Sequence, residues 1–125
     1  RNILGVLDWE LAAIGDPLMD LGNSMAYWIQ MDDDFFIKSL RRQPSNLNGM
    51  MTRNEVISYY QEKIGIEIDD FRFYRVYGLF RLAGIVQQIY FRYSKGYTKN
   101  KAFKNFWMVS NYLILTCNKI IKRGY

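Results

Sequence analysis

Two carboxylates stand at the end of the first apolar stretch of the chain. Residues 3–9 read Ile-Leu-Gly-Val-Leu-Asp-Trp, which is typical of a β-strand, and Asp8 and Glu10 would then lie on one face of that strand. A carboxylate there is costly unless it meets a cation, a metal ion or backbone donors. Because Mg²⁺ is commonly held by one or two carboxylates with phosphate oxygens and water, Asp8 suits a magnesium site. The alternative is an Asp that caps a turn.

Two arginines further along the chain are the next candidates. Arg81 has apolar neighbours in the sequence, among which an unpaired guanidinium would be costly, and Arg92 follows about three helical turns later on a similar face. Either guanidinium could hold an anionic substrate group, a carboxylate or a phosphate, through bidentate contacts. The alternative is an internal ion pair with Asp20, Glu10 or Glu62.

Two charged segments have simpler explanations. The three consecutive aspartates at residues 32–34 lack the alternating ligands and the glycine of a calcium loop, and we interpret them as a solvated turn. The lysines of residues 95–104 alternate with aromatic residues, a pattern that can bind nucleic acid. A solvated surface with its aromatic side chains turned inward explains the same residues.

Helices must position most of these groups. Asp16 before Pro17 predicts the start of a helix that runs to about Met31, and residues 40–51 are typical of a loop. The strand at residues 3–9 has no partner in this sequence, so the strands that pair with it must lie outside it. The predicted fold class is mainly α, with one N-terminal β-strand followed by about four helices.

Three further helices follow the loop. The second of them is apolar on almost every face, so we expect it to be central and mostly buried. The first of them is predicted to begin at Thr52, in a capping box with Glu55, and to end at Gly65. The second begins at Asp69 or Asp70 and runs to Tyr93. The third begins at Asn100 and ends at Gly124.

The charge of the chain is divided unevenly. The 125 residues carry a formal net charge of +5, but all 12 acidic residues lie within residues 1–70, which sum to −6, whereas residues 71–125 sum to +11. A basic region of this kind suggests nucleic acid or an anionic membrane as a partner. However, half of the residues are hydrophobic and 17% are aromatic, which favours a folded domain. A basic nucleic-acid-binding domain stays as an alternative, with affinity that falls steeply with salt.

Residue types that are absent exclude other functions. The chain has no histidine, which excludes catalysis by Ser-His-Asp or Cys-His groups and zinc sites built on histidine. Its single cysteine, Cys117, excludes an internal disulfide and fits a reducing, cytoplasmic compartment. No uncharged run reaches the roughly 20 residues that a membrane helix needs, so we expect no membrane partner.

Two segments resemble a known family. Leu-Asp-Trp-Glu at residues 7–10, Gly-Asp-Pro at 15–17 and Asp-Leu at 20–21 closely resemble the metal-binding segment of the aminoglycoside phosphotransferase-like kinases. These kinases share the protein-kinase-like fold and bind ATP between two lobes. Gly-Leu-Phe-Arg-Leu-Ala-Gly-Ile at residues 78–85, with Arg92, is similar to the long C-lobe helix of members linked to acyl-CoA dehydrogenases.

The resemblance implies roles for individual residues. Asp8 would coordinate Mg²⁺ on the ATP phosphates, in the position of the Asp of the protein-kinase DFG motif. Asp20 would match a buried Asp that braces the catalytic loop, and Glu10 could form part of the site wall. Arg81 and Arg92 would lie on the wall of the acceptor-substrate pocket.

The resemblance also implies a fragment. Residues 1–125 would be part of a C-terminal lobe, with a metal-binding strand and loop at 1–15 and a helical subdomain at 16–125. The whole enzyme would transfer a phosphoryl group from ATP to the hydroxyl of a small molecule, a hydroxyacyl compound rather than an antibiotic by analogy. A homodimer could form through the exposed surface of the lobe.

One departure from the family limits this prediction. The catalytic loop of these kinases, a His-x-Asp followed five residues later by Asn, should precede the metal-binding segment, but the chain contains no histidine. The phosphate-covering loop and the nucleotide-contacting Lys of the N-lobe are also missing. We therefore assign no catalytic residue in this chain and expect it to be inactive alone. The alternative is a non-catalytic helical interaction module on a degenerate kinase fold.

Overall fold

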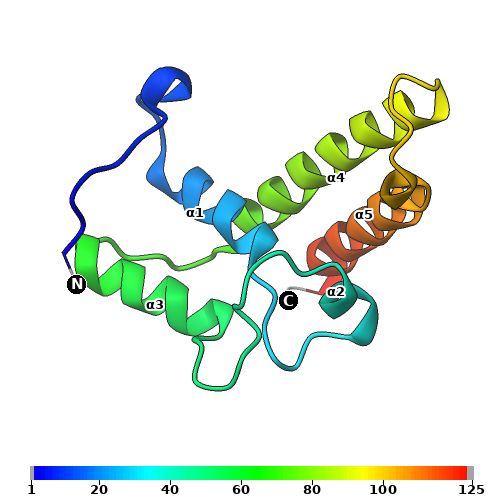
Figure 1. Cartoon of the computed structure of the whole chain (residues 1–125). Coiled ribbons are helices and arrows are strands. Elements are labelled where there is room, and N and C mark those ends of the chain that lie inside the picture. The colour runs from blue at the N-terminus through cyan, green and yellow to red at the C-terminus, as the bar shows by residue number, and fades with distance from the viewer. Residues whose placement is uncertain (1, 124–125) are drawn as a thin grey trace.

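Five α-helices and two short 3₁₀ helices make up the computed structural model, which describes residues 2–123 and, at Leu11, only the backbone (Figure 1). The predicted fold class is confirmed as mainly α. The elements in chain order are η1 (Trp9–Leu11), α1 (Pro17–Tyr27), α2 (Phe35–Ser39), α3 (Arg53–Ile64), α4 (Arg72–Ser94), η2 (Lys101–Phe103) and α5 (Phe106–Arg123).

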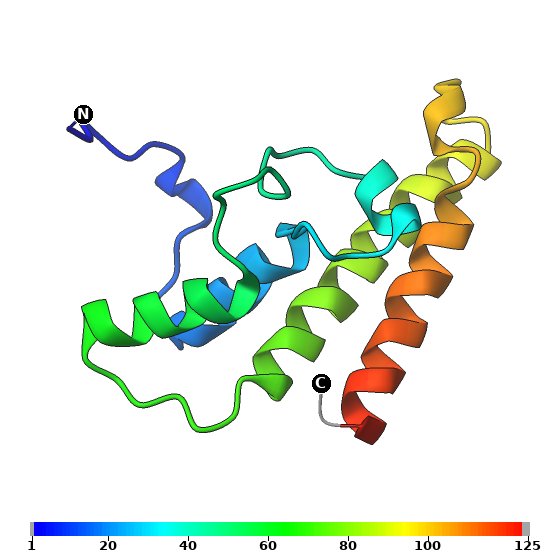
Figure 2. The same cartoon turned by 90° about the horizontal axis from the view of Figure 1, so that it is seen from below.

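The predicted N-terminal strand is wrong. Residues 2–123 contain no β-strand, and residues 2–8 form an irregular segment that projects from the helices (Figures 1 and 2). Its side chains are exposed, with Leu4 99% and Leu7 88% accessible. A strand needs a neighbour for its backbone hydrogen bonds, and no other segment of the described chain lies in that role. Asp8 and Glu10 therefore do not share one face of a strand.

The first helix ends earlier than its sequence predicts, at Tyr27 instead of Met31. The reason is competition for backbone donors. The Ile29 N–H donates to the Ser45 hydroxyl (3.2 Å) and the Gln30 N–H donates to the Asp33 carboxylate (2.8 Å), so neither is available to extend the helix. These partners come from tertiary contacts and from the following turn, which hydrophobic periodicity does not reveal.

The predicted capping signals are confirmed at α3, whereas α4 begins after Phe71, without a side-chain cap, and not after Asp69 or Asp70. Thr52 and Glu55 form the predicted capping box at the start of α3, and α3 ends at Gly65, whose φ of 68° favours glycine. Asp70 accepts a hydrogen bond from the Arg72 N–H at the start of α4 (2.9 Å). Asn100 caps η2, not α5, because the predicted last helix is broken after Phe103; the end predicted at Gly124 lies outside the described residues.

Helix α4 is the centre of the fold, and α1 crosses it with the two backbones in direct contact (Figure 1). Gly22 of α1 faces Gly78 of α4 at the crossing. A Cβ atom at Gly78 would lie 2.1 Å from the Gly22 carbonyl oxygen, and one at Gly22 would lie 2.3 Å from the Tyr74 carbonyl oxygen. The two helices can therefore approach this closely only because both positions are glycine.

Helix α5 returns antiparallel to α4 and packs along its other side (Figure 2). The core between them is built on Ala83, Val86 and Leu113. The prediction that α4 is mostly buried holds only in part, since its buried residues are Gly78, Ala83 and Val86, while Phe73 and Phe80 are each 65% exposed. No helix within residues 2–123 has the length and hydropathy that crossing a bilayer requires.

We predict that Gly78→Ala lowers the free energy of unfolding by about 2–3 kcal/mol, because the new Cβ must push the backbone of α1 away from α4. Urea denaturation followed by circular dichroism measures the effect.

Gly84→Ala on the same helix is the matched control. No atom lies within 4 Å of a Cβ at Gly84, so the substitution should stabilise the protein by about 0.5–1 kcal/mol through helix propensity. Equal effects of the two substitutions would contradict the close crossing.

Candidate functional site

Asp8 adopts a backbone conformation that distinguishes it from the other described residues. Its φ of 72° and ψ of 46° are left-handed, and among residues 2–123 it is the one non-glycine residue with positive φ. This conformation costs an L-residue about 1 kcal/mol, and such residues cluster at functional sites. The turn is fixed on both sides, since the Trp9 indole N–H donates to the Val6 carbonyl (2.8 Å) and η1 begins at Trp9.

The carboxylate of Asp8 is exposed and makes no capping hydrogen bond to η1. The alternative interpretation, an Asp whose side chain caps this turn, is therefore not supported. Within residues 2–123 no group of three or more His, Cys, Asp and Glu residues could hold a metal ion. A single free carboxylate does not form an all-protein metal cage, but it fits Mg²⁺, which takes its remaining ligands from phosphate and water.

The other acidic candidates are also exposed. Glu10 lies in η1, two residues after Asp8, and Asp20 lies in the first turn of α1. Asp20 was expected to be buried against donors of a catalytic loop, but its side chain is exposed in the described structure. Its carboxylate is thus free to accept such bonds, and its bracing role stays a prediction.

Asp16 anchors this acidic segment to the helices. Its Oδ1 accepts a hydrogen bond from the Leu18 N–H (2.9 Å), which confirms the predicted helix cap. Its Oδ2 accepts a hydrogen bond from the Tyr74 hydroxyl of α4 (2.8 Å), and this bond raises the pKa of Tyr74. The carboxylate of Asp16 therefore fixes both the start of α1 and the position along α4 at which α1 contacts it.

The structure does not bury the two arginine candidates. Arg81 and Arg92 are exposed on α4, and the ion pairs found within residues 2–123 involve neither of them. The alternative of an internal ion pair for Arg81 is therefore not supported within the described residues, and its exposed side chain does not need a partner to offset burial. Its role in binding an anionic substrate group stays a prediction. The end of α4 that carries Arg92 lies on the opposite side of the molecule from residues 2–11 (Figures 1 and 2). The structure thus does not bring Asp8 and Arg92 together.

A pocket of about 320 Å³ lies between α1, α2, α4 and α5. Its lining is almost wholly apolar, with Leu82 and Ile89 from α4 and Phe106 from α5 among the residues that form it. Arg42, in the loop after α2, is the cation among its lining residues. The volume falls in the usual range for small-molecule pockets. No pattern along the chain signals this pocket, because its walls come from several separate elements.

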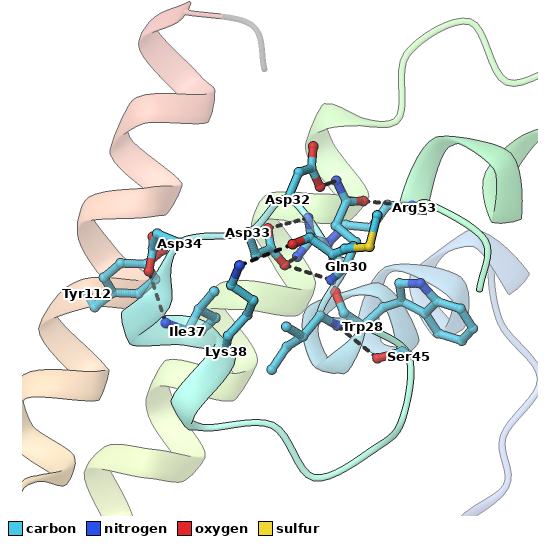
Figure 3. Close-up of polar contacts among 12 residues, drawn as sticks. Trp28, Gln30, Asp32, Asp33, Asp34, Ile37, Lys38, Ser45, Arg53 and Tyr112 are labelled. Carbon is cyan, nitrogen blue, oxygen red and sulfur yellow. Dashed lines mark hydrogen bonds and ion pairs between the residues drawn. The ribbon is translucent and has the colours of Figure 1, made fainter. Parts of the chain in front are cut away.

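A polar network holds the loops that the core does not reach; we call it the Asp33–Arg53 network (Figure 3). The guanidinium of Arg53 binds both carboxylate oxygens of Asp33, with Nη1 to Oδ1 at 3.0 Å, and its Nε donates to the Trp28 carbonyl (2.8 Å). Gln30 links the two, since its Oε1 accepts from the Arg53 N–H (2.9 Å). The side chains of Arg53 and Asp33 are only 17% and 16% exposed.

The three consecutive aspartates are therefore not simply a solvated turn. Asp32 accepts a hydrogen bond from the Gln30 amide (2.6 Å), and Asp33 pairs with Arg53. Asp34 caps α2 through the Ile37 N–H (3.0 Å) and accepts a hydrogen bond from the Tyr112 hydroxyl of α5. Each carboxylate has its own donor, so the triplet ties α2, α3 and α5 together.

The contact between Asp34 and Tyr112 shifts the pKa of both groups in opposite directions. The Tyr112 hydroxyl, followed by the Ile37 N–H, lowers the pKa of Asp34. Burial, followed by the hydrogen bond to Asp34, raises the pKa of Tyr112 to about 12. The neutral phenol and the charged carboxylate are the forms that the fold stabilises.

A comparison with models of known protein families finds a match that includes the acidic segment around Asp8. Residues 1–53 match the model of the phosphotransferase enzyme family, so the metal-binding segment predicted around Asp8 lies inside the match. The resemblance to this class of protein is confirmed.

The similar curated proteins are acyl-CoA dehydrogenase family members. The chain is 36% identical over 93 residues to acyl-CoA dehydrogenase family member 10 of Mus musculus, which covers 73% of this chain and 9% of the relative. It is 32% identical over 97 residues to family member 11 of Homo sapiens, covering 76% of this chain and 12% of the relative. The chain thus spans about a tenth of the length of the relatives it matches. No solved structure matches it.

We predict that Asp33→Asn lowers the free energy of unfolding by about 2–3 kcal/mol, because it leaves the half-buried guanidinium of Arg53 without its carboxylate. Thermal or urea unfolding measures the loss.

Glu62→Gln is the control, since the Glu62–Lys63 pair has side chains that are 71% and 54% exposed and should contribute little. An Asp33→Asn protein as stable as the Glu62→Gln protein would show that the network does not hold the loops.

We predict that Tyr112 titrates about two pH units above an ordinary tyrosine. Because its pKa is raised in the folded state, its contribution to stability is complete below pH 10 and is lost as the pH rises from 10 to about 12. Phenolate absorbance of the wild type minus Tyr112→Phe isolates this one hydroxyl.

Proposed function

We propose that this chain is the C-terminal part of a kinase-like phosphotransferase that transfers a phosphoryl group from ATP to the hydroxyl of a small molecule. The observation that carries the proposal is Asp8, a free carboxylate on a left-handed residue inside the segment that matches the phosphotransferase family. A strained backbone conformation at an acidic residue such as Asp8 is expected where that residue serves a functional site.

Asp8 would hold Mg²⁺ on the ATP phosphates, with Glu10 beside it on the wall of the site. Mg²⁺, when bound, would neutralise the charge that develops on the transferred phosphoryl group. Asp20 would accept hydrogen bonds from the catalytic loop, and the exposed position of its carboxylate at the first turn of α1 leaves it free to do so. Asp16 keeps this segment in place through Tyr74.

The acceptor that fits best is a hydroxyacyl compound. The pocket of about 320 Å³ is apolar and carries Arg42, so it suits an alkyl chain that ends in or continues to an anionic group. Residues 71–125 carry 11 basic and no acidic residues, a charge that would repel a polycationic antibiotic. The relatives from Mus musculus and Homo sapiens are named as acyl-CoA dehydrogenase family members, which favours an acyl compound as the acceptor here. Arg81 and Arg92 would add surface attraction for an anionic acceptor.

The proposal extends to the activity of the chain alone, its cellular location and its oligomeric state. The chain alone would not transfer phosphoryl groups, because it has no His-x-Asp motif to supply a catalytic base. A cytoplasmic location fits its single buried thiol, Cys117. The apolar side chains exposed along residues 3–7 and on α4 leave room for a homodimer.

We predict that Asp8→Ala, introduced into a longer protein that contains this chain and its upstream lobe, lowers ATP-dependent phosphorylation of a hydroxyacyl substrate by at least about 100-fold. It should also weaken Mg²⁺-dependent ATP binding in calorimetry, which is a readout separate from turnover.

Asp69→Ala removes an exposed carboxylate outside the matched segment and serves as the control, with unchanged turnover expected. Full activity of Asp8→Ala would contradict the proposal. So would ATP-dependent phosphorylation by the purified 125-residue chain that Asp8→Ala abolishes, because it would mean that no upstream lobe is needed.

A further inference from the structure

A second, smaller pocket, which we call the Arg75 pocket, lies between α1, α4 and α5 and borders the Asp33–Arg53 network. It measures about 120 Å³ and is lined by apolar side chains that include Met25 and Leu79. Its polar lining consists of the charged side chains of Arg75, Arg53 and Asp33 together with Tyr112 and Thr116. Arg75 is half-buried on α4, directly after Tyr74, whose hydroxyl anchors Asp16. Nothing in the sequence marked Arg75, because its burial depends on the packing of three helices.

The carboxylates near this pocket already have partners. Oδ1 of Asp33 accepts a hydrogen bond from Arg53 Nη1 (3.0 Å), and Oδ2 accepts from the Gln30 N–H (2.8 Å) and from Arg53 Nη2. The oxygens of Asp34 accept from the Ile37 N–H and the Tyr112 hydroxyl. Arg75 takes part in none of the ion pairs found within residues 2–123. The pocket is therefore lined by two guanidinium groups and one carboxylate, which Arg53 already engages.

This arrangement leaves positive charge in a partly apolar place. Burial lowers the pKa of Arg75, and the charge of Arg53 lowers it further, while Asp33 offsets only part of the effect. A guanidinium that is desolvated without a hydrogen-bonded anion is costly. An anion that enters the pocket would remove this cost and would gain a fork of donors with the geometry of a carboxylate.

We propose that the Arg75 pocket binds the carboxylate of a small organic acid whose short apolar tail lies against Met25 and Leu79. The pocket is smaller than the roughly 300 Å³ at which ordinary ligand pockets begin, so the tail must be short. A phosphate suits it less, because a dianion needs more donors than the one free guanidinium supplies and lies close to the charge of Asp33. The inference does not rest on the proposed phosphotransferase function, since none of these residues lies in the segment around Asp8.

Butyrate is the probe, and the 125-residue chain is titrated with it while amide chemical shifts are recorded. Saturable shifts should appear in the segments around residues 25, 75–79 and 112–116. Arg75→Met should weaken the affinity at least tenfold. Arg72→Met on the same helix is the matched control, because Arg72 pairs with Asp70 on the surface, and its affinity should stay within twofold of the wild type.

Stability separates loss of binding from loss of folding. Arg75→Met removes an unpaired guanidinium, so without ligand it should melt at or above the temperature of the wild type. Butyrate should raise the melting temperature of the wild type alone. Arg75→Lys keeps the charge but loses the fork, and it should also bind more weakly, which provides the test if Arg75→Met does not fold.

Four results would overturn the proposal. These are shifts that do not saturate, equal butyrate affinity of the wild type and Arg75→Met, equal binding of butanol (which has the tail but no charge), and tighter binding of inorganic phosphate than of butyrate at the same amides.

Discussion

The contact between the backbones of Gly22 and Gly78 is the constraint on which the rest of the structure depends. It sets the distance between α1 and α4, and α5 packs on α4 in turn. The start of α1 carries the acidic segment, so the crossing also fixes where that segment leaves the helical body. The hydrogen bond from Tyr74 to Asp16 acts one helical turn from the crossing and keeps α1 from sliding along α4.

The apolar core and the Asp33–Arg53 network stabilise different parts of the chain. Ala83, Val86 and Leu113 join α4 to α5 by apolar packing. Helix α3 has no buried residue, and Arg53 at its start connects it to the loop after α1. Charged hydrogen bonds depend on direction and on the exact partner, whereas apolar packing tolerates exchange of similar side chains. The loops are therefore the part of the fold with the least freedom to change residue type.

Local signals in the sequence predicted local features well. The caps at Asp16 and Thr52 and the end of α3 at Gly65 involve partners within four residues, so the sequence around them is sufficient. Asp8 could be proposed as a metal ligand from the sequence for the same reason, because the motif that carries it is contiguous. The strand at residues 3–9 failed because its pairing needs a distant segment, and the exposure of Arg81 could not be read from apolar neighbours that occupy other faces of the helix. The burial of Arg75 and the two pockets depend on the packing of several elements against one another. No pattern along the chain predicts that packing.

The way α3 is attached has a consequence for how the protein opens. A helix without buried residues, held through one ion pair and a few hydrogen bonds at its N-terminal end, can detach and melt while α1, α4 and α5 stay packed. Native-state hydrogen exchange would then show two tiers, with the amides of α3 exchanging through local opening and those around Leu113 only through global unfolding. Salt would accelerate the first tier more than the second, since it screens the ion pair but not the apolar core.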